Sequence, residues 1–425
     1  MRASAWNRLR KSASMEKGKG RKGKKMINQE FKAMLSNKNV IRNMAEFAAA
    51  RGKEIGYENV FDFSLGNPST VVPQEVTDYM IRLLQEKDSL ALHGYSPTTG
   101  NVLYKEKIAE SLNERFGMEY TGNHIFPTTG AAGALAHAVR AVTKPGDEIL
   151  LFAPFFPEYT PYLTKAGLTM QVVPADTETF QIKFDAFEEM LSEKTAAVLI
   201  NTPNNPSGVV YSEETLTRLA KILYDCSDRY GHNIFLISDE PYREILYQGV
   251  QAPFVSRFYD HTLVCYSFAK SLSMPGERIG YVAVNPRCED AEYIVPMCGQ
   301  ISRGIGHNCP PSFFQIAVAQ FPSLTSDIRV YEKNMNLIYD TLMDLNMTCV
   351  KPDGTFYIFP KAPEEDSIAF CEKAKQYDLI LVPGDSFGAP GFFRMAYCID
   401  TEKVERAMPR FRQFIQEGYG TIIPA

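Results

Sequence analysis

The sequence predicts an α/β protein with a large, mainly parallel sheet domain and a smaller α+β domain. In the middle of the chain, short apolar runs alternate with helix-length segments, and after about residue 315 the pattern changes. A chain of 425 residues is also too long for one small core. Continuous apolar strands separated by helices are typical of a parallel sheet covered on both faces. The predicted strands are residues 149–153, 197–201, 234–239, 263–267 and 279–284.

Helical patterns between these strands include residues 131–143 and 213–225. The later part of the chain indicates a separate unit. It contains a helix over 330–346, three short apolar segments and a final amphipathic helix from Glu402. We expect residues 66–315 to form the large domain and 316–425 the small one. Residues 26–65 are expected to be an N-terminal arm that joins the small domain.

The charge is uneven along the chain. Residues 1–25 hold ten Lys or Arg and one acidic residue, so this leader carries +9 and the rest carries −14 of the total of −5. An acidic body argues against nucleic-acid binding. The leader is rich in Arg and Ser, as transit peptides are. A Gly/Lys-rich segment has little to fold with, so we favour a disordered tail or a start codon assigned upstream of Met15 or Met26.

Composition excludes several other classes of protein. No window reaches the eighteen or so uninterrupted apolar residues of a membrane-spanning helix, so we expect no membrane association. The eight cysteines include no Cys-x-x-Cys pair, and none of the six histidines stands at ligand spacing from another, which argues against a metal site. Scattered cysteines indicate reduced thiols in a cytoplasmic protein.

Polar or turn-forming clusters follow several predicted strands: APFFPEY, NTPNNPSG, SDEPY and SFAKS. Because ligands of such sheets bind beyond the carboxyl ends of the strands, these clusters should converge on one crevice. Asn205 is either a turn residue or a fixed amide donor over that crevice. Asp239 ends an apolar strand, where a carboxylate is costly unless a cation or a strong donor pairs with it. It should therefore face a positively charged group, although a helix-capping role, taken alone, explains it better.

Two further motifs suggest a phosphorylated, carbonyl-bearing ligand. TTGAAGALAHAV (128–139) is a small-residue turn that opens a helix, which suits either a phosphate or close packing. Lys270 stands beside a buried strand end, where a lowered pKa would make its amine a nucleophile able to form a Schiff base. Ser267 and Arg278 would suit a phosphate. A carbonyl, a phosphate and a cationic ring partnered by Asp239 together describe pyridoxal 5′-phosphate (PLP).

The segment SFAKSLSMPGERIGY resembles the Ser-x-x-Lys-x(7)-Arg-x-Gly signature of the class I/II aminotransferases of fold type I, the aspartate aminotransferase superfamily. The other motifs follow in that family's order over residues 30–420. The resemblance implies a large, mainly parallel sheet of the seven-stranded type and a smaller α+β domain. It also implies a transaminase that moves an amino group from an L-amino acid to a 2-oxo acid by a ping-pong cycle. We expect 2-oxoglutarate as the acceptor, and an aspartate-type donor is weakly favoured.

The resemblance also assigns roles at the cofactor ring. Lys270 would hold PLP as a covalent aldimine and then move the proton at the substrate α-carbon. Asp239 would pair with the protonated pyridine nitrogen. Asn205 and Tyr242 would hydrogen-bond the 3′-oxygen, and Phe156 would stack on the ring.

The phosphate and the substrate have further candidate residues by the same resemblance. The phosphate would be held by Arg278, Ser267 and the backbone of Gly130, Ala131 and Ala132, and Tyr95 would reach the phosphate of the neighbouring subunit in a homodimer. Arg394 would clamp the substrate α-carboxylate, and a loop containing Gly66 and Asn67 would close over it. Arg303 lies near the position of a distal-carboxylate arginine from the partner subunit, but in a register that differs by about a residue.

Two other functions are compatible with parts of the pattern. A carbon–sulfur β-lyase can use the same fold and cofactor, but NTPNNPSG and SDEPY resemble the transaminase versions of these motifs. A PLP-sensing regulator would need a DNA-binding domain in front. Only about 60 residues precede the first site motif, which leaves no room for a helix-turn-helix module.

Overall fold

The computed structural model describes residues 27–35, 40–247 and 249–420. These residues belong to two units that divide after Asn39, and the first contributes one described helix, α2 (Gln29–Met34). The predicted disordered leader, residues 1–25, lies outside the described residues. The predicted domain limits at residues 66 and 316 stay a prediction.

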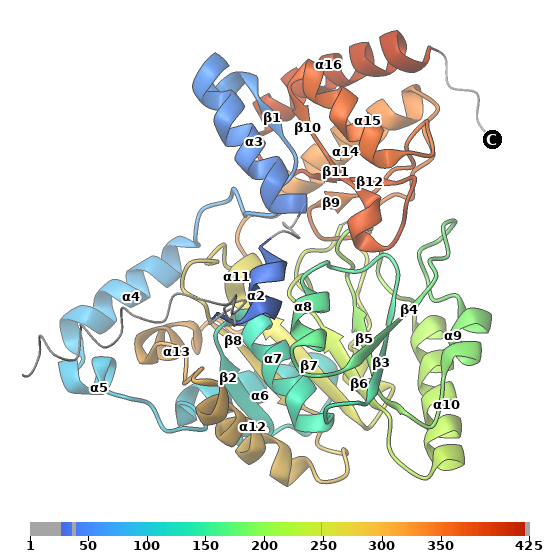
Figure 1. Ribbon diagram of the computed structural model, residues 1–425. Coiled ribbons are helices and arrows are strands. Elements are labelled where there is room, and N and C mark those ends of the chain that lie inside the picture. Colours follow the sequence, from blue (N-terminus) through green and yellow to red (C-terminus); the bar gives the residue numbers. More distant parts are fainter. Residues whose placement is uncertain (1–26, 36–39, 248, 421–425) are drawn as a thin grey trace, which may run out of the picture. The chain divides into compact units, whose positions relative to one another are not determined.

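The second unit contains a sheet of seven strands, which confirms the predicted fold class (Figure 1). All neighbouring strands are parallel except β8, which runs antiparallel to both its neighbours, β2 and β7. Each of the five predicted strands lies within two residues of its expected limits. The strand order is β2 (Ile125–Thr128), β8 (Gly280–Val284), β7 (Thr262–Ser267), β6 (Phe235–Asp239), β5 (Thr195–Asn201), β3 (Glu148–Phe152), β4 (Thr169–Val173).

Sequence patterning did not reveal β2 and β4, the two edge strands. β2 is four residues long and contains Pro127, which cannot donate to a sheet. β4 is only partly buried, so it lacks the continuous apolar run that marks the central strands.

Helices cover both faces of this sheet because successive residues of its strands point to opposite sides. Ile149 and Leu151 pack on one face with α7 (Gly130–Val142), α8 (Tyr159–Thr164) and α12 (Ala291–Ile305). Leu150 and Phe152 pack on the other face. The helices of that second face are α6 (Val102–Phe116), α9 (Phe184–Met190) and α10 (Glu213–Tyr230).

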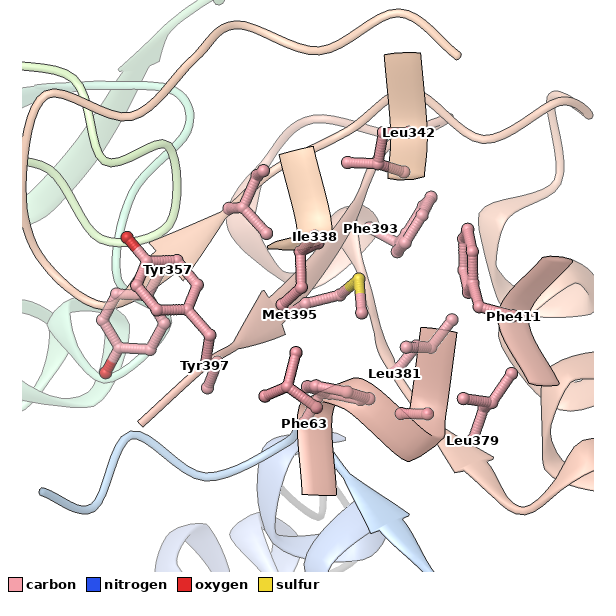
Figure 2. Close-up of a cluster of buried hydrophobic side chains, with 14 of the residues drawn as sticks. Phe63, Ile338, Leu342, Tyr357, Leu379, Leu381, Phe393, Met395, Tyr397 and Phe411 are labelled. Atoms are coloured by element: carbon pink, nitrogen blue, oxygen red, sulfur yellow. The ribbon is translucent and has the colours of Figure 1, made fainter. Parts of the chain in front are cut away.

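A second group of elements combines the beginning and the end of this unit (Figure 1). Strand β1 (Phe61–Asp62) pairs in parallel with β10 (Leu379–Ile380), and β11 (Val382–Pro383), β12 (Phe393–Ala396) and β9 (Tyr357–Ile358) form an antiparallel sheet in that order. Buried side chains of β1, β9, β10 and β12 share one core with Ile338 and Leu342 of α14 (Arg329–Asp344) and Phe411 of α16 (Thr401–Tyr419) (Figure 2). The helices of this group are α3 (Val40–Ile55), α14 (Arg329–Asp344), α15 (Ser367–Ala374) and α16 (Thr401–Tyr419).

The remaining described elements are four further helices and five short 3₁₀ turns. They are α4 (Gln74–Glu86), α5 (Ser89–His93), α11 (Phe268–Ser271), α13 (Ser312–Val318) and the 3₁₀ turns η1 (Tyr57–Asn59), η2 (Gly122–His124), η3 (Val255–Arg257), η4 (Lys375–Tyr377) and η5 (Gly384–Phe387). Within the described ranges, no helix has both the length and the apolar character needed to cross a membrane.

Candidate active site

The carboxyl ends of β5, β6 and β7 meet at one edge of the large sheet, as the polar clusters predicted. Asn201, Asp239 and Cys265 are register partners across the three strands. The Asn201 side chain ties two of these ends together, because its amide donates to the carbonyl of Asp239 at 2.8 Å. The backbone N–H of Asn205 in turn donates to the Asn201 side chain at 2.7 Å.

Asp239 is a buried carboxylate with only one partnered oxygen. The Tyr159 hydroxyl donates to Oδ2 at 2.6 Å, whereas Oδ1 has no hydrogen-bond partner among the described residues. Burial raises the pKa of Asp239 to about 7, and the Tyr159 hydrogen bond works against that rise. The cation expected opposite Asp239 is not found among the described side chains that contact it. The free oxygen is therefore available to a donor from a ligand.

Lys270 lies in the short helix α11, directly after β7. The Ser267 hydroxyl begins this helix by accepting from the backbone of Ala269 at 3.2 Å. The Lys270 ammonium donates to the carbonyl of Gly66 at 2.7 Å and lies 5.3 Å from the ring centre of Phe356. Withdrawal from water lowers the pKa of Lys270 to about 8, so a sizeable fraction of this amine is unprotonated near neutral pH.

The start of α7 forms a small cradle together with Arg278 and Ser267. Gly130 has a φ of 76°, and a Cβ placed there would lie 3.0 Å from Arg278 Nη2 and 3.4 Å from Ser267 Oγ. No described side chain caps the first N–H groups of α7. A helix start with uncapped N–H groups, an arginine and a hydroxyl fits a phosphate. The predicted residues Gly130, Ala131, Ala132, Ser267 and Arg278 are thus brought together.

Arg394 of β12 is a fully buried cation. It donates to the Asn205 side-chain oxygen at 3.0 Å and to the carbonyl of Ser64 at 2.5 Å. Its Nε has no partner among the described residues, and the two groups that accept from it are an amide oxygen and a backbone carbonyl, neither of them a carboxylate. Burial lowers the pKa of Arg394. A buried guanidinium without a counter-ion fits a carboxylate from a ligand.

Three successive backbone carbonyls, those of residues 64–66, face this site. The carbonyl of Ser64 accepts from Arg394, that of Leu65 from the Cys398 thiol at 3.5 Å, and that of Gly66 from Lys270. The predicted loop at Gly66 and Asn67 therefore lies against both the candidate lysine and the candidate arginine.

Tyr242 and Phe156 lie within the same region. The hydroxyl of Tyr242 is 3.0 Å from that of Tyr357, and burial raises the pKa of Tyr242 well above its usual value. A Cβ at Gly66 would lie 1.8 Å from the Tyr357 hydroxyl, so this position requires glycine. Phe156 meets Tyr159 edge to face, with ring centres 5.7 Å apart.

Tyr159, Tyr357 and Cys398 were missed in the sequence analysis. Tyr159 could have been found, because it follows Phe156 by three residues in the polar cluster after β3. Tyr357 and Cys398 belong to apolar runs that read as core, and only the tertiary fold brings them to the site.

Tyr95 and Arg303 lie together, but away from the other candidates. Both line a pocket of about 630 Å³ at the surface, between α5 and the residues that follow α12. The Tyr95 side chain is fully exposed, and Arg303 donates to the Gln300 side chain at 3.2 Å. Among the described contacts, none joins either residue to Lys270, Asp239 or Arg394.

Comparisons with known proteins agree with this architecture. The family model for aminotransferase class I and II matches residues 58–411. An aspartate aminotransferase of Thermotoga maritima is 30% identical over 366 residues, covering 84% of this chain and 92% of the relative. An aromatic-amino-acid aminotransferase of Thermococcus litoralis is 28% identical over 379 residues, covering 85% and 93%. A solved amino transferase of Eubacterium rectale is 44% identical, with a TM-score of 0.91, and the match covers 93% of this chain and all of that one.

The fold and the comparisons define a fold-type I enzyme of the transaminase class. The chain belongs to the aminotransferase class I and II family. The family implies pyridoxal 5′-phosphate as the cofactor, and the uncapped start of α7 and the free Asp239 oxygen fit this group.

Proposed function

We propose that the enzyme transfers the amino group of an L-amino acid to 2-oxoglutarate by a ping-pong cycle, with aspartate-type donors preferred. The observation that carries the proposal is the Lys270 amine and the half-partnered Asp239 carboxylate at one edge of the large sheet, together with the buried Arg394 guanidinium, which reaches Asn205 at that edge. Several relatives bear the name aspartate aminotransferase, which supports the donor class.

Cofactor binding would divide among three groups of residues. The phosphate would occupy the cradle formed by Arg278, Ser267 and the start of α7. The free Oδ1 of Asp239 would accept the N–H of the protonated pyridine ring. The amide nitrogen of Asn205 would donate to the 3′-oxygen, since its Oδ1 is already engaged by Arg394, and the Tyr242 hydroxyl would donate beside it. Phe156 would cover one face of the ring.

Pyridoxal 5′-phosphate supplies an electron sink that makes the α-hydrogen of a bound amino acid acidic. Lys270 would first hold the cofactor covalently through Nζ. Once the substrate amine has displaced it, the free Nζ would take the proton from the substrate α-carbon and deliver it to C4′ of the cofactor. An amine pKa of about 8 suits this work, because the group can both accept and release a proton near neutral pH.

Substrate binding would use the unpaired cation. Arg394 would form two parallel hydrogen bonds to the substrate α-carboxylate, exchanging its bond to the carbonyl of Ser64 for bonds to the ligand. Asn205 would keep the guanidinium oriented through their 3.0 Å hydrogen bond. The segment at Gly66 and Asn67 would cover the bound substrate and exclude water.

Two copies of the chain would share their active sites. Tyr95 would donate to the cofactor phosphate of the partner, and Arg303 would bind a distal carboxylate there. The position of both residues on one surface pocket supports this, because a single partner surface could then receive both side chains. A cytoplasmic location, proposed from the scattered thiols, agrees with the eight unpaired cysteines of the structure.

A half-reaction screen tests the proposal. The cofactor-loaded enzyme is mixed with one amino acid at a time, and loss of the visible cofactor band is followed together with release of oxo acid. Stoichiometric conversion with aspartate and glutamate, reversed by 2-oxoglutarate, is the expected result, and Lys270→Ala should give no turnover. Release of ammonia and pyruvate from cysteine or cystathionine, with the band restored, would identify a carbon–sulfur β-lyase instead.

A further inference from the structure

Four hydroxyl groups from separate parts of the chain meet beside the candidate lysine. Thr70 Oγ1 lies 2.5 Å from Ser273 Oγ, 2.9 Å from Ser326 Oγ and 3.0 Å from the Tyr331 hydroxyl. Ser273 also donates to Ser326 at 3.1 Å. We call Thr70, Ser273, Ser326 and Tyr331 the hydroxyl cluster.

The members of the hydroxyl cluster belong to segments that carry the active site. Thr70 lies four residues after Gly66, and Ser273 lies three residues after Lys270. Tyr331 is a buried residue of α14, and the backbone N–H of Ser326 donates to the carbonyl of Ser271 at 2.7 Å. The cluster thus connects the segment that covers the substrate to the turn that holds the lysine.

The turn after Lys270 needs such support. Ser273 has a φ of 53°, a left-handed conformation that costs free energy for a residue with a Cβ. Its side chain makes two hydrogen bonds within the cluster, which hold this conformation in place. A change at Thr70 therefore reaches the lysine turn through Ser273.

Within the described residues, segment 64–67 and Lys270 share one direct hydrogen bond, from Nζ to the carbonyl of Gly66. That bond needs an N–H of the free lysine side chain, either the amine or the ammonium. In the proposed function Lys270 alternates between a free side chain and a nitrogen bound covalently to the cofactor, which would have fewer N–H donors and a fixed direction. The hydroxyl cluster does not depend on the chemical state of Lys270, so it can hold the segment in both states.

We propose that Thr70 is a positioning residue for catalysis: through the hydroxyl cluster it holds segment 64–67 against the Lys270 turn while the lysine is engaged with the cofactor. The hydroxyl of Thr70 is engaged by Ser273, Ser326 and Tyr331, so this role needs no contact with substrate or cofactor. The inference rests on the proposed function, in which segment 64–67 covers the substrate. The link from Thr70 to the Lys270 turn can be tested without measuring turnover.

The test uses Thr70→Val, which removes the hydroxyl at nearly constant shape, in the cofactor-loaded enzyme. Backbone hydrogen exchange is measured for peptides covering residues 62–72 and 268–276, and kcat and KM are measured separately. Thr70→Val should exchange faster in both peptides, with a KM for the amino donor raised about 3- to 10-fold, the effect of losing one or two hydrogen bonds. The cofactor dissociation constant should stay unchanged.

Two variants accompany the first. Ser69→Ala changes the exposed neighbour of Thr70 and should match the unaltered enzyme in exchange and KM. Ser273→Ala keeps a Cβ at the left-handed position, removes only the hydroxyl, and should reproduce the faster exchange, which keeps the test decisive if Thr70→Val folds poorly.

The outcomes separate this inference from the proposed function. If exchange in residues 62–72 is the same in Thr70→Val, Ser273→Ala and Ser69→Ala, the positioning role is wrong even where transamination is established. A lower melting temperature with unchanged exchange and KM would also overturn it, because that is the result of a merely structural hydrogen bond. Faster exchange in an enzyme that fails the half-reaction screen would retain the structural link and reject the proposed function.

Discussion

The Tyr159 hydroxyl donates a hydrogen bond of 2.6 Å to Oδ2 of Asp239, while Oδ1 of the same carboxylate lacks a partner among the described residues. This bond fixes the rotation of the carboxyl group. It also lowers the pKa of Asp239 against the effect of burial, which raises it to about 7. Tyr159 therefore controls how much of the carboxylate is ionised.

Tyr159→Phe should weaken the pairing of Asp239 with the cofactor ring. Loss of a hydrogen bond to a charged group costs about 1.5–3 kcal/mol, so we expect the cofactor dissociation constant to rise roughly 10-fold or more. Absorbance titration of the cofactor-free variant measures this constant. Tyr120→Phe is the matched control, since it removes an equally buried hydroxyl that lies 2.7 Å from Ser256, away from the site. Equal affinities in the two variants would contradict a role for Tyr159.

Asp239 should make the cofactor-free protein less stable as pH rises. Its folded pKa of about 7 exceeds the unfolded value of about 3.9, so between these values the folded state holds more protons, and the free energy of unfolding falls. Asp239→Asn should remove this fall in the free energy of unfolding, which is on the order of 2–4 kcal/mol. Urea unfolding of both cofactor-free proteins at pH 5 and pH 7.5 measures the difference. Asp185→Asn, at an exposed position, is the control, and parallel pH profiles for all three proteins would refute the buried ionisation.

Lys270 should capture the cofactor faster at higher pH. Only the neutral amine attacks a carbonyl, and with a pKa of about 8 the neutral fraction grows tenfold per pH unit below that value and then levels off. Stopped-flow absorbance after mixing cofactor-free enzyme with pyridoxal 5′-phosphate measures the rate. Lys270→Ala should not develop the absorbance band of the covalently bound cofactor. Lys221→Ala, which changes an exposed lysine, should bind the cofactor at the normal rate. A rate that still rises steeply at pH 9.5 would exclude a lowered pKa.

Arg394→Gln should impair substrate binding and spare the cofactor. The variant would lose two charge-assisted hydrogen bonds to the α-carboxylate, which together stabilise the bound substrate by about 3–4 kcal/mol. We therefore expect kcat/KM to fall roughly 100- to 1,000-fold. Steady-state kinetics with the best donor measure the loss, and the cofactor dissociation constant should not change. Arg257→Gln, at an exposed arginine, serves as the comparison. A similar loss for an amine substrate without a carboxylate would rule out the clamp.

Arg303→Ala should change selectivity. If the side chain binds a distal carboxylate in the partner's site, kcat/KM for aspartate and glutamate should fall about 10-fold or more, with alanine and aromatic donors little affected. The measurement is the ratio of kcat/KM for aspartate or glutamate to kcat/KM for alanine or aromatic donors. A uniform decrease across all donors would mean that Arg303 acts on the assembly and not on the substrate.

The central part of the fold could be predicted because its signals are local. Strands β3, β5, β6, β7 and β8 are continuous apolar runs, and the cluster after each strand end follows directly in the sequence. Lys270, Asp239 and Asn205 could be found for the same reason, because Asp239 ends a predicted strand and the other two follow one within four residues.

Contacts across long separations could not be predicted in this way. Thr70 and Ser273 are separated by 203 positions and Tyr242 and Tyr357 by 115, and no local pattern marks either pair. Tyr159 donates to Asp239 where we expected a cation, and its hydrogen bond offsets only part of the effect of burial, because the pKa of Asp239 is still raised to about 7.

The hydrogen bond from Arg394 to the carbonyl of Ser64 spans 330 positions, and β1 pairs with β10 over a similar distance. Such contacts close very long loops, so they form late when a chain folds. The large sheet can assemble from residues 125–284 before these contacts exist. During synthesis, nearly the whole chain must therefore leave the ribosome before the carboxylate-binding half of the site is complete, and the newly made protein becomes an enzyme only in its last steps of folding.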